Sequence, residues 1–158
     1  MSDITAIDQT FHLDGNVEIG KFTCLMASAT NYSDGCLNPS GANVQCLGVA
    51  QESILPDAMA DYSGGQYTLT SGTSWPSNAI PSSGQGRNIR TRMLGISRVV
   101  ANAAIARMSL VNIAGTSGYV KTVSESGVTI YPVGLALDVA SQQGDVIRVL
   151  VDTQPYKG

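Results

Sequence analysis

The chain contains a single histidine, His12, so this residue limits the acid–base chemistry that the sequence can offer. A Ser-His-Asp triad would have to use His12 as its general base. The pattern G-x-S-x-G, which presents a nucleophilic serine in many hydrolases, is absent. His12 also lies in a polar N-terminal stretch. We therefore interpret it as a solvent or interface residue, and we expect the protein not to be an enzyme.

Two further stretches carry residue types that bind phosphate or metal in other proteins. Residues 83–88, SGQGRN, are glycine-rich with an adjacent arginine, but they lack the P-loop pattern and precede an expected strand rather than a helix. Asp138 and Asp145 do not have the alternating acidic spacing of an EF-hand loop. We interpret both stretches as ordinary turns, and we expect no cofactor.

The three cysteines, Cys24, Cys36 and Cys46, do not indicate a metal site or a disulfide framework. Their separations are longer than the short paired spacings of structural zinc sites. An odd number of cysteines, in a chain whose start lacks a basic and an apolar signal region, argues against disulfides. No stretch is apolar for the roughly 18 residues of a membrane span. We expect buried thiols, no metal, no membrane, and synthesis in a cytoplasm.

Charge is unevenly distributed along the chain. Residues 1–61 hold eight acids and one base, giving −7, whereas residues 62–124 hold six bases and no acid, giving +6. Proteins that bind single-stranded nucleic acid interleave bases with aromatic side chains. The basic run over residues 86–107 contains no Phe, Tyr or Trp. We therefore favour contact with an acidic protein surface over contact with nucleic acid.

The sequence repeats itself. Residues 19–51 align with residues 105–137 at an offset of 86 without a gap, and Gly48 and Gly134 coincide. Residues 83–93 resemble residues 141–151 at an offset of 58, which is 28 fewer. The first copy therefore carries an insertion between about 52 and 82. A glycine inside an apolar strand marks a bulge, a bend or a close backbone approach.

The local patterns favour strands. Alternating segments such as NIRTRMLGI, apolar runs bounded by turns and abundant glycine predict an all-β, mainly β protein. We expect a small barrel or sandwich over residues 17–158, built from two similar β units. The first unit comprises 17–51 plus 83–96, and the second comprises 97–152. The insertion, 52–82, has room for one short helix starting near Pro56.

Two segments leave alternatives open. Residues 1–16 are predicted to be an N-terminal arm that orders against a neighbour, with a first strand of the chain's own sheet as the alternative. Trp75, in the insertion, is either an exposed interface anchor or part of a lid packed on the chain's own core.

The C-terminal part carries a pattern of small and apolar residues at Ile105, Leu110, Val111, Pro132, Val133, Gly134, Ala136, Gly144, Val146 and Val149. Through these positions the chain resembles the capsid cement (decoration) proteins of tailed bacteriophages. The resemblance covers residues 96–152 best and residues 17–51 more weakly.

The resemblance implies a structural virion protein on the outer surface of a capsid, made in the host cytoplasm. It would bind the major capsid protein and neighbouring copies of itself, as a trimer or a dimer, and stabilise the head. The alternative is a β-barrel module for receptor or glycan binding, or a fibre base. The interface residues that we expect are Phe11, His12, Trp75, Arg87, Arg90 and Arg92.

Overall fold

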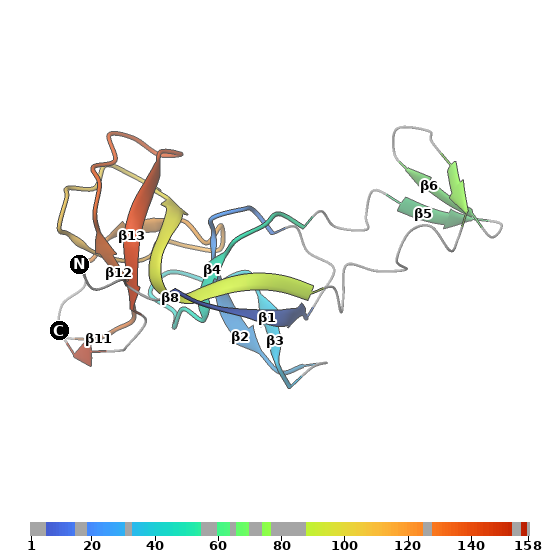
Figure 1. Ribbon diagram of the computed structural model, residues 1–158, viewed down its shortest axis with the longest axis horizontal. Coiled ribbons are helices and arrows are strands. Elements are labelled where there is room, and N and C mark those ends of the chain that lie inside the picture. Colours follow the sequence, from blue (N-terminus) through green and yellow to red (C-terminus); the bar gives the residue numbers. More distant parts are fainter. Residues whose placement is uncertain are drawn as a thin grey trace.

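The computed structural model describes residues 6–14, 19–30, 33–54, 88–124 and 128–152, and the backbone of four short segments, 60–63, 66–69, 74–76 and 156–157. This described part contains strands and no helix, which confirms the predicted mainly β class (Figure 1). None of its elements is a helix that could span a membrane.

Nine strands form the main sheet. In sheet order they are β1 (Ile7–Leu13), β3 (Gly35–Leu37), β2 (Cys24–Ser28), β4 (Gly48–Ala50), β8 (Asn88–Val100), β13 (Val146–Asp152), β12 (Pro132–Ala136), β9 (Leu110–Ile113) and β10 (Val120–Thr122). Two smaller sheets contain β5 (Ala60–Ser63), β6 (Gln66–Leu69) and β7 (Ser74–Pro76), and β11 (Thr129–Ile130) with β14 (Tyr156–Lys157).

The first four strands close into a barrel with the first half of β8. Strand β1 pairs in parallel with β3 and antiparallel with residues 88–94 of β8, so the order β1-β3-β2-β4-β8 returns to β1. Closure of this kind removes the exposed edges on which strands of other molecules add. We call these five strands the first barrel unit.

The second half of β8 begins a similar arrangement. Residues 95–100 of β8 pair with β13, and the order continues through β12 and β9 to β10. A parallel bridge between Ala101 and Val120 brings the end of β8 back to β10. We call these strands the second barrel unit. The boundary expected between residues 96 and 97 thus falls within one continuous strand that serves both units (Figure 1).

Equivalent residues of the two units make the same backbone contacts. The bridge between Ile19 and Ile54 recurs 86 residues later between Ile105 and Ala140. The cross-strand pair Cys24–Val49 recurs as Leu110–Leu135, again 86 residues later. Phe22 and Met108, also 86 apart, have positive φ angles of 67° and 64°. The offset of 86 seen in the sequence is therefore a repeated hydrogen-bonding register.

The second offset, 58, appears where the fifth strand joins each unit. Val49 pairs with Arg92 of β8, and its equivalent Leu135 pairs with Leu150 of β13. The offset from Arg92 to Leu150 is 58. The difference between the two offsets corresponds to the chain between β4 and β8, which contains β5, β6 and β7.

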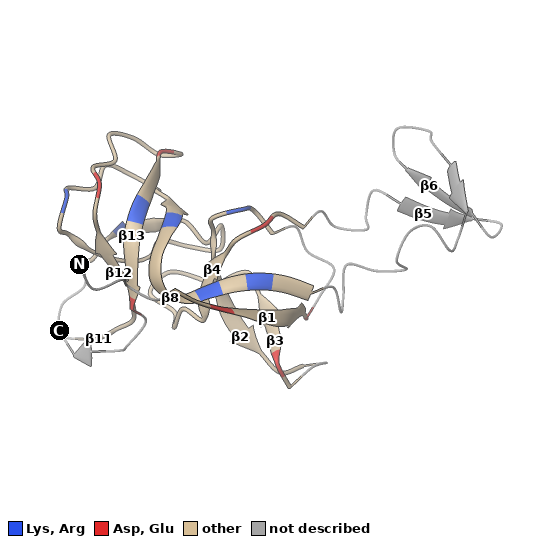
Figure 2. Cartoon of the chain, in the orientation of Figure 1, with Lys and Arg blue, Asp and Glu red and all other residues tan. Residues whose placement is uncertain are grey.

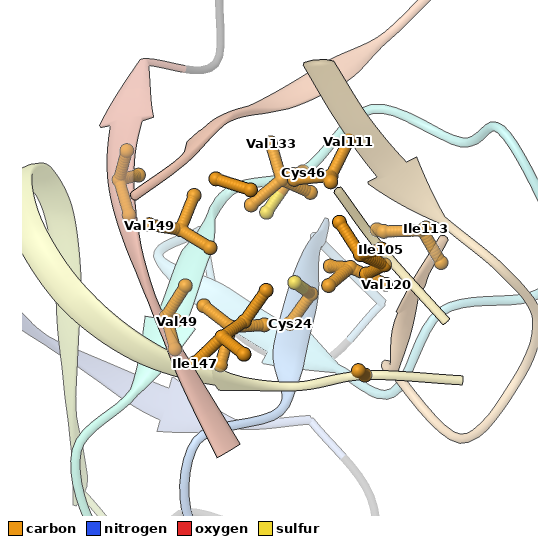
Figure 3. Packing of buried hydrophobic residues seen from close by; sticks show 14 of the residues in the cluster. Cys24, Cys46, Val49, Ile105, Val111, Ile113, Val120, Val133, Ile147 and Val149 are labelled. Carbon is orange, nitrogen blue, oxygen red and sulfur yellow. The ribbon is translucent and has the colours of Figure 1, made fainter. Parts of the chain in front are cut away.

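Strand β8 shows why the sequence folds in this way. Its burial alternates over most of its length, with Ile89, Thr91, Gly95, Ser97 and Val99 inward. This alternation is the period of a strand with one face on a core. The core forms two clusters of buried apolar side chains, one within the first unit and a larger one that fills the second unit. Cys24, Cys46 and Val49 of the first unit belong to the larger cluster (Figure 3).

Two expectations need correction. The predicted N-terminal arm is, over Ile7–Leu13, strand β1 of the main sheet, because its backbone bonds to β8 and β3 complete the first barrel. The short helix expected near Pro56 falls partly on residues 55–59, which lie outside the described residues. Where the structure resumes, Ala60–Ser63 is strand β5, which pairs with β6.

Candidate functional site

Strands β1 and β3 bring His12 and Asp34 together on the surface of the first unit. The Nδ1 atom of His12 lies 2.9 Å from both carboxylate oxygens of Asp34. Both side chains remain well exposed to solvent. The prediction that His12 is a solvent or interface residue is consistent with this exposure, and Asp34 is a partner that the sequence did not indicate.

Phe11, expected at an interface, points into the molecule instead. It is 7% exposed and packs in the core of the first unit with residues such as Leu13 and Ile89. The alternation of β1 places Phe11 and Leu13 inward and His12 between them outward. Phe11 therefore stabilises the fold, and it also lines a pocket with Ala27 and Leu47.

Arg92 finds its acidic partner within the same chain. Its Nε and Nη2 atoms donate to the two carboxylate oxygens of Asp8 at 2.7 and 2.9 Å. Its Nη1 atom donates to the backbone oxygen of Ile96 at 2.7 Å. The hydrogen bonds from Arg92 hold the pKa of Asp8 below its usual value. The guanidinium that we expected to meet another protein thus ties β1 to β8.

Arg90 lies on the same outward face of β8 and is exposed. Its backbone nitrogen donates to Glu52 at 2.7 Å. Arg148 is the equivalent residue in the second unit, and its backbone nitrogen donates to the carboxylate of Asp138 at 3.0 Å. The basic segments of β8 and β13 are visible side by side in Figure 2.

Arg98 and Arg148 face each other directly across β8 and β13. Like charges at directly opposed positions of a sheet destabilise it. Arg148 is balanced by Asp138, whose carboxylate oxygens accept from Nε at 2.9 Å and from Nη2 at 2.7 Å. These hydrogen bonds lower the pKa of Asp138 to about 2. The guanidinium of Arg98 lies 6.0 Å from the ring centre of Phe22, a cation–π contact.

These basic side chains surround a shallow pocket of about 330 Å³ at the junction of the two units. The pocket combines guanidinium groups with apolar walls, an arrangement that accepts a carboxylate next to an apolar side chain. The charge distribution in the sequence indicated this basic region, but Arg98 and Arg148 come together only through the pairing of β8 with β13. The lining residues are Phe22, Gln51, Arg92, Ile96, Ser97, Arg98 and Arg148.

The remaining expected interface residues lie outside this description. Arg87 falls outside the described residues. Trp75 lies in β7, where its backbone pairs with Tyr67 of β6, and its side chain is outside the described part.

The described residues contain no group of three or more His, Cys, Asp or Glu side chains that could hold a metal ion. The three cysteines are free and buried. Burial raises the pKa of Cys36 to about 12. The thiols therefore belong to the apolar core, as the sequence predicted.

No protein-family model and no curated protein matches this chain. Among solved structures, the chain is similar to the crystal structure of the head fiber gp8.5 N base in bacteriophage phi29. The two are 12% identical, with a TM-score of 0.59, and the match covers 96% of this chain and 100% of the other. At this identity the similarity concerns the fold. The chain therefore shares the fold of a bacteriophage head fiber base.

Proposed function

We propose that this protein is a structural component of a phage virion, bound to the outer surface of the head. The observation that carries the proposal is the fold shared with the phi29 head fiber base over nearly the full length of both chains. The resemblance of residues 96–152 to capsid cement proteins, which rests on the sequence and not on the fold, supports the same location. In this proposal the protein acts by binding, without catalysis and without a cofactor.

The proposed partners are the major capsid protein and neighbouring copies of this chain, in a dimer or a trimer. The basic pocket of β8 and β13 suits an acidic surface of a partner, because Arg98 and Arg148 line it together with apolar Ile96 and Phe22. Electrostatic complementarity of this kind raises the association rate and selects the partner. The proposed finer role is that of a cement protein, which stabilises the head against the pressure of packaged DNA.

Binding to bare, expanded heads of the phage that encodes the chain tests the location. We expect saturable, stoichiometric binding and a higher temperature of DNA release from decorated heads. Arg90→Glu should reduce occupancy at low salt, since it reverses an exposed charge on the basic face, whereas Arg90→Lys, which keeps the charge, serves as the control. Absence of binding under all salt conditions would eliminate the proposal.

A second role, the base of a head fibre that contacts host receptors or glycans, is favoured by one observation, namely that the similar solved structure is itself a fiber base. Decorated and undecorated particles separate the two roles. A cement protein changes the DNA release temperature and leaves adsorption to host cells unchanged. A fibre base changes adsorption, and glycan arrays probed with the purified protein would then give a specific signal.

A further inference from the structure

The outer face of the second unit carries a row of four apolar side chains. Leu110 of β9 pairs with Leu135 of β12, Leu135 pairs with Leu150 of β13, and Leu150 pairs with Ile96 of β8. Directly paired residues project from the same face of a sheet. All four are partly exposed, and Ile96 is 38% exposed. We call these four residues the apolar row.

The equivalent row of the first unit is covered over half of its length. Its members are Cys24, Val49, Arg92 and Asp8, which pair across the strands in the same register. Cys24 and Val49 are fully buried, because the second unit packs on them, and the Cys24 nitrogen donates to the Gly118 oxygen at 2.8 Å. The row then ends in the ion pair between Arg92 and Asp8.

The surface that covers this row belongs to one end of the second unit. Ile113 and Val133 share a core cluster with Cys24 and Val49 (Figure 3). Val99 belongs to the same cluster. Within the molecule, the first unit therefore contributes its outer row to the contact between the units, and the second unit contributes the end of its barrel.

The first unit has the equivalent end. The offset of 86 relates Ile113 and Val133 to Ala27 and Leu47. Val99 corresponds to Phe11, because their strand partners Ile147 and Ile89 are equivalent at the offset of 58. Phe11, Ala27 and Leu47 line a pocket of about 350 Å³, together with Ala29 and Asp34. Within the described part of the chain, the outer row of the second unit and this end of the first unit are both open. They are the counterparts of the two surfaces that join the units to each other.

We propose that the apolar row of one copy docks onto the pocket end of the first unit of a second copy. The contact repeats, between molecules, the kind of packing that joins the two units within one molecule. Charge supports the same pairing, because Arg98 and Arg148 lie beside the row while Asp34 lies at the pocket. Such a contact joins unlike surfaces, so it closes into a symmetric oligomer, such as the proposed dimer or trimer, or continues as a filament.

This inference specifies the surfaces for the self-association proposed above, and it rests on that proposal for the choice of a second copy as partner. Its tests use the purified protein alone. A negative result in these tests would not contradict the proposal of capsid binding. Likewise, a lack of capsid binding would not contradict self-association.

Sedimentation over a range of concentrations provides the first test. We expect the wild-type protein to assemble and Ala27→Arg to remain monomeric with an unchanged melting temperature, because Ala27 is exposed at the pocket end. Leu135→Arg should have the same effect from the other side of the contact. Ala103→Arg, at an exposed site away from both surfaces, should assemble like the wild type. A wild-type protein that is monomeric at every concentration would overturn the inference.

Cross-linking tests which surfaces meet. Leu110→Cys and Ala27→Cys are purified separately, mixed, and treated with a short bismaleimide, to which the three buried native thiols are inaccessible. We expect cross-linked dimers in the mixture and none with either variant alone. Replacing Ala27→Cys by Ala103→Cys in the mixture should abolish the product. Efficient cross-linking of Leu110→Cys with itself would mean that two rows meet face to face, and it would overturn the head-to-tail contact.

Discussion

Gly134 lies directly against the backbone carbonyl of Leu150, so closely that a Cβ atom at position 134 would overlap the carbonyl oxygen. The equivalent glycine of the first unit, Gly48, has the same relationship to Arg92, whose carbonyl oxygen would lie 2.6 Å from a Cβ. In both cases the nearest atom belongs to the backbone of the neighbouring strand, which cannot move aside without disturbing the sheet. The sequence left a bulge, a bend and a close backbone approach as alternatives for these two glycines, and the structure shows a close approach at both.

Gly134→Ala should therefore destabilise the protein strongly. Overpacking of this kind costs about 1–3 kcal/mol and more when the obstacle is backbone. Gly115→Ala is the matched control, since nothing lies within 4 Å of a Cβ at that position. Urea denaturation followed by circular dichroism gives both free energies of unfolding. Equal stability of the two variants would contradict the close-approach interpretation.

Phe11→Ala distinguishes a strand from an arm. Because Phe11 is buried in the first barrel, its truncation should lower the free energy of unfolding by about 3–5 kcal/mol. Thr10→Ala, at an exposed neighbouring position of β1, should cost far less. Thermal melts of the isolated protein measure both. An N-terminal arm that orders only on a partner would leave the melting temperature unchanged by Phe11→Ala.

The ion pair between Asp8 and Arg92 is suited to a charge swap. Asp8→Arg alone places two cations opposite each other, and we expect it to lower the free energy of unfolding by about 1 kcal/mol or more. The double variant Asp8→Arg with Arg92→Asp should recover part of this loss. A double variant that is no more stable than the sum of the single changes would show that the pair contributes nothing.

Asp138 makes stability depend on pH. Because hydrogen bonds from Arg148 lower its pKa from 3.8 to about 2 in the folded state, the ionised form stabilises the fold above about pH 4. This contribution is lost as the pH falls from 3.8 towards 2. Asp138→Asn should therefore be less stable than the wild type at pH 6, with the difference disappearing near pH 2. A difference that is constant across this range, measured by denaturation at each pH, would exclude the linkage.

The thiols should be inert in the folded protein. Hydrogen bonding with Cys46 and burial raise the pKa of Cys24, and burial raises that of Cys36. We expect Ellman's reagent to modify no cysteine quickly in native buffer and all three in 6 M guanidinium. Rapid labelling of one thiol in native buffer would show that its part of the barrel opens easily.

Particular residues show how far the sequence could be interpreted. The alternation in residues 88–100 predicted a half-buried strand, and the coincidence of Gly48 with Gly134 predicted a repeated backbone feature. The sequence did not predict that Asp8 is the partner of Arg92, because 84 positions separate the two residues. Phe11 was expected at an interface, and in the structure it packs in the core of its own chain. A short amphipathic segment has the same pattern whether its apolar face meets its own chain or another.

The sequence by itself determined the period of the strands, the two repeat offsets and the positions where only glycine fits, because these depend on local backbone geometry and on internal similarity. Only the tertiary structure decided that β1 closes the first barrel, that β8 serves both units and that one outer row is covered over half of its length while its equivalent is open. Those outcomes depend on contacts between residues distant in sequence. Identical local patterns can be buried or exposed according to what packs on them.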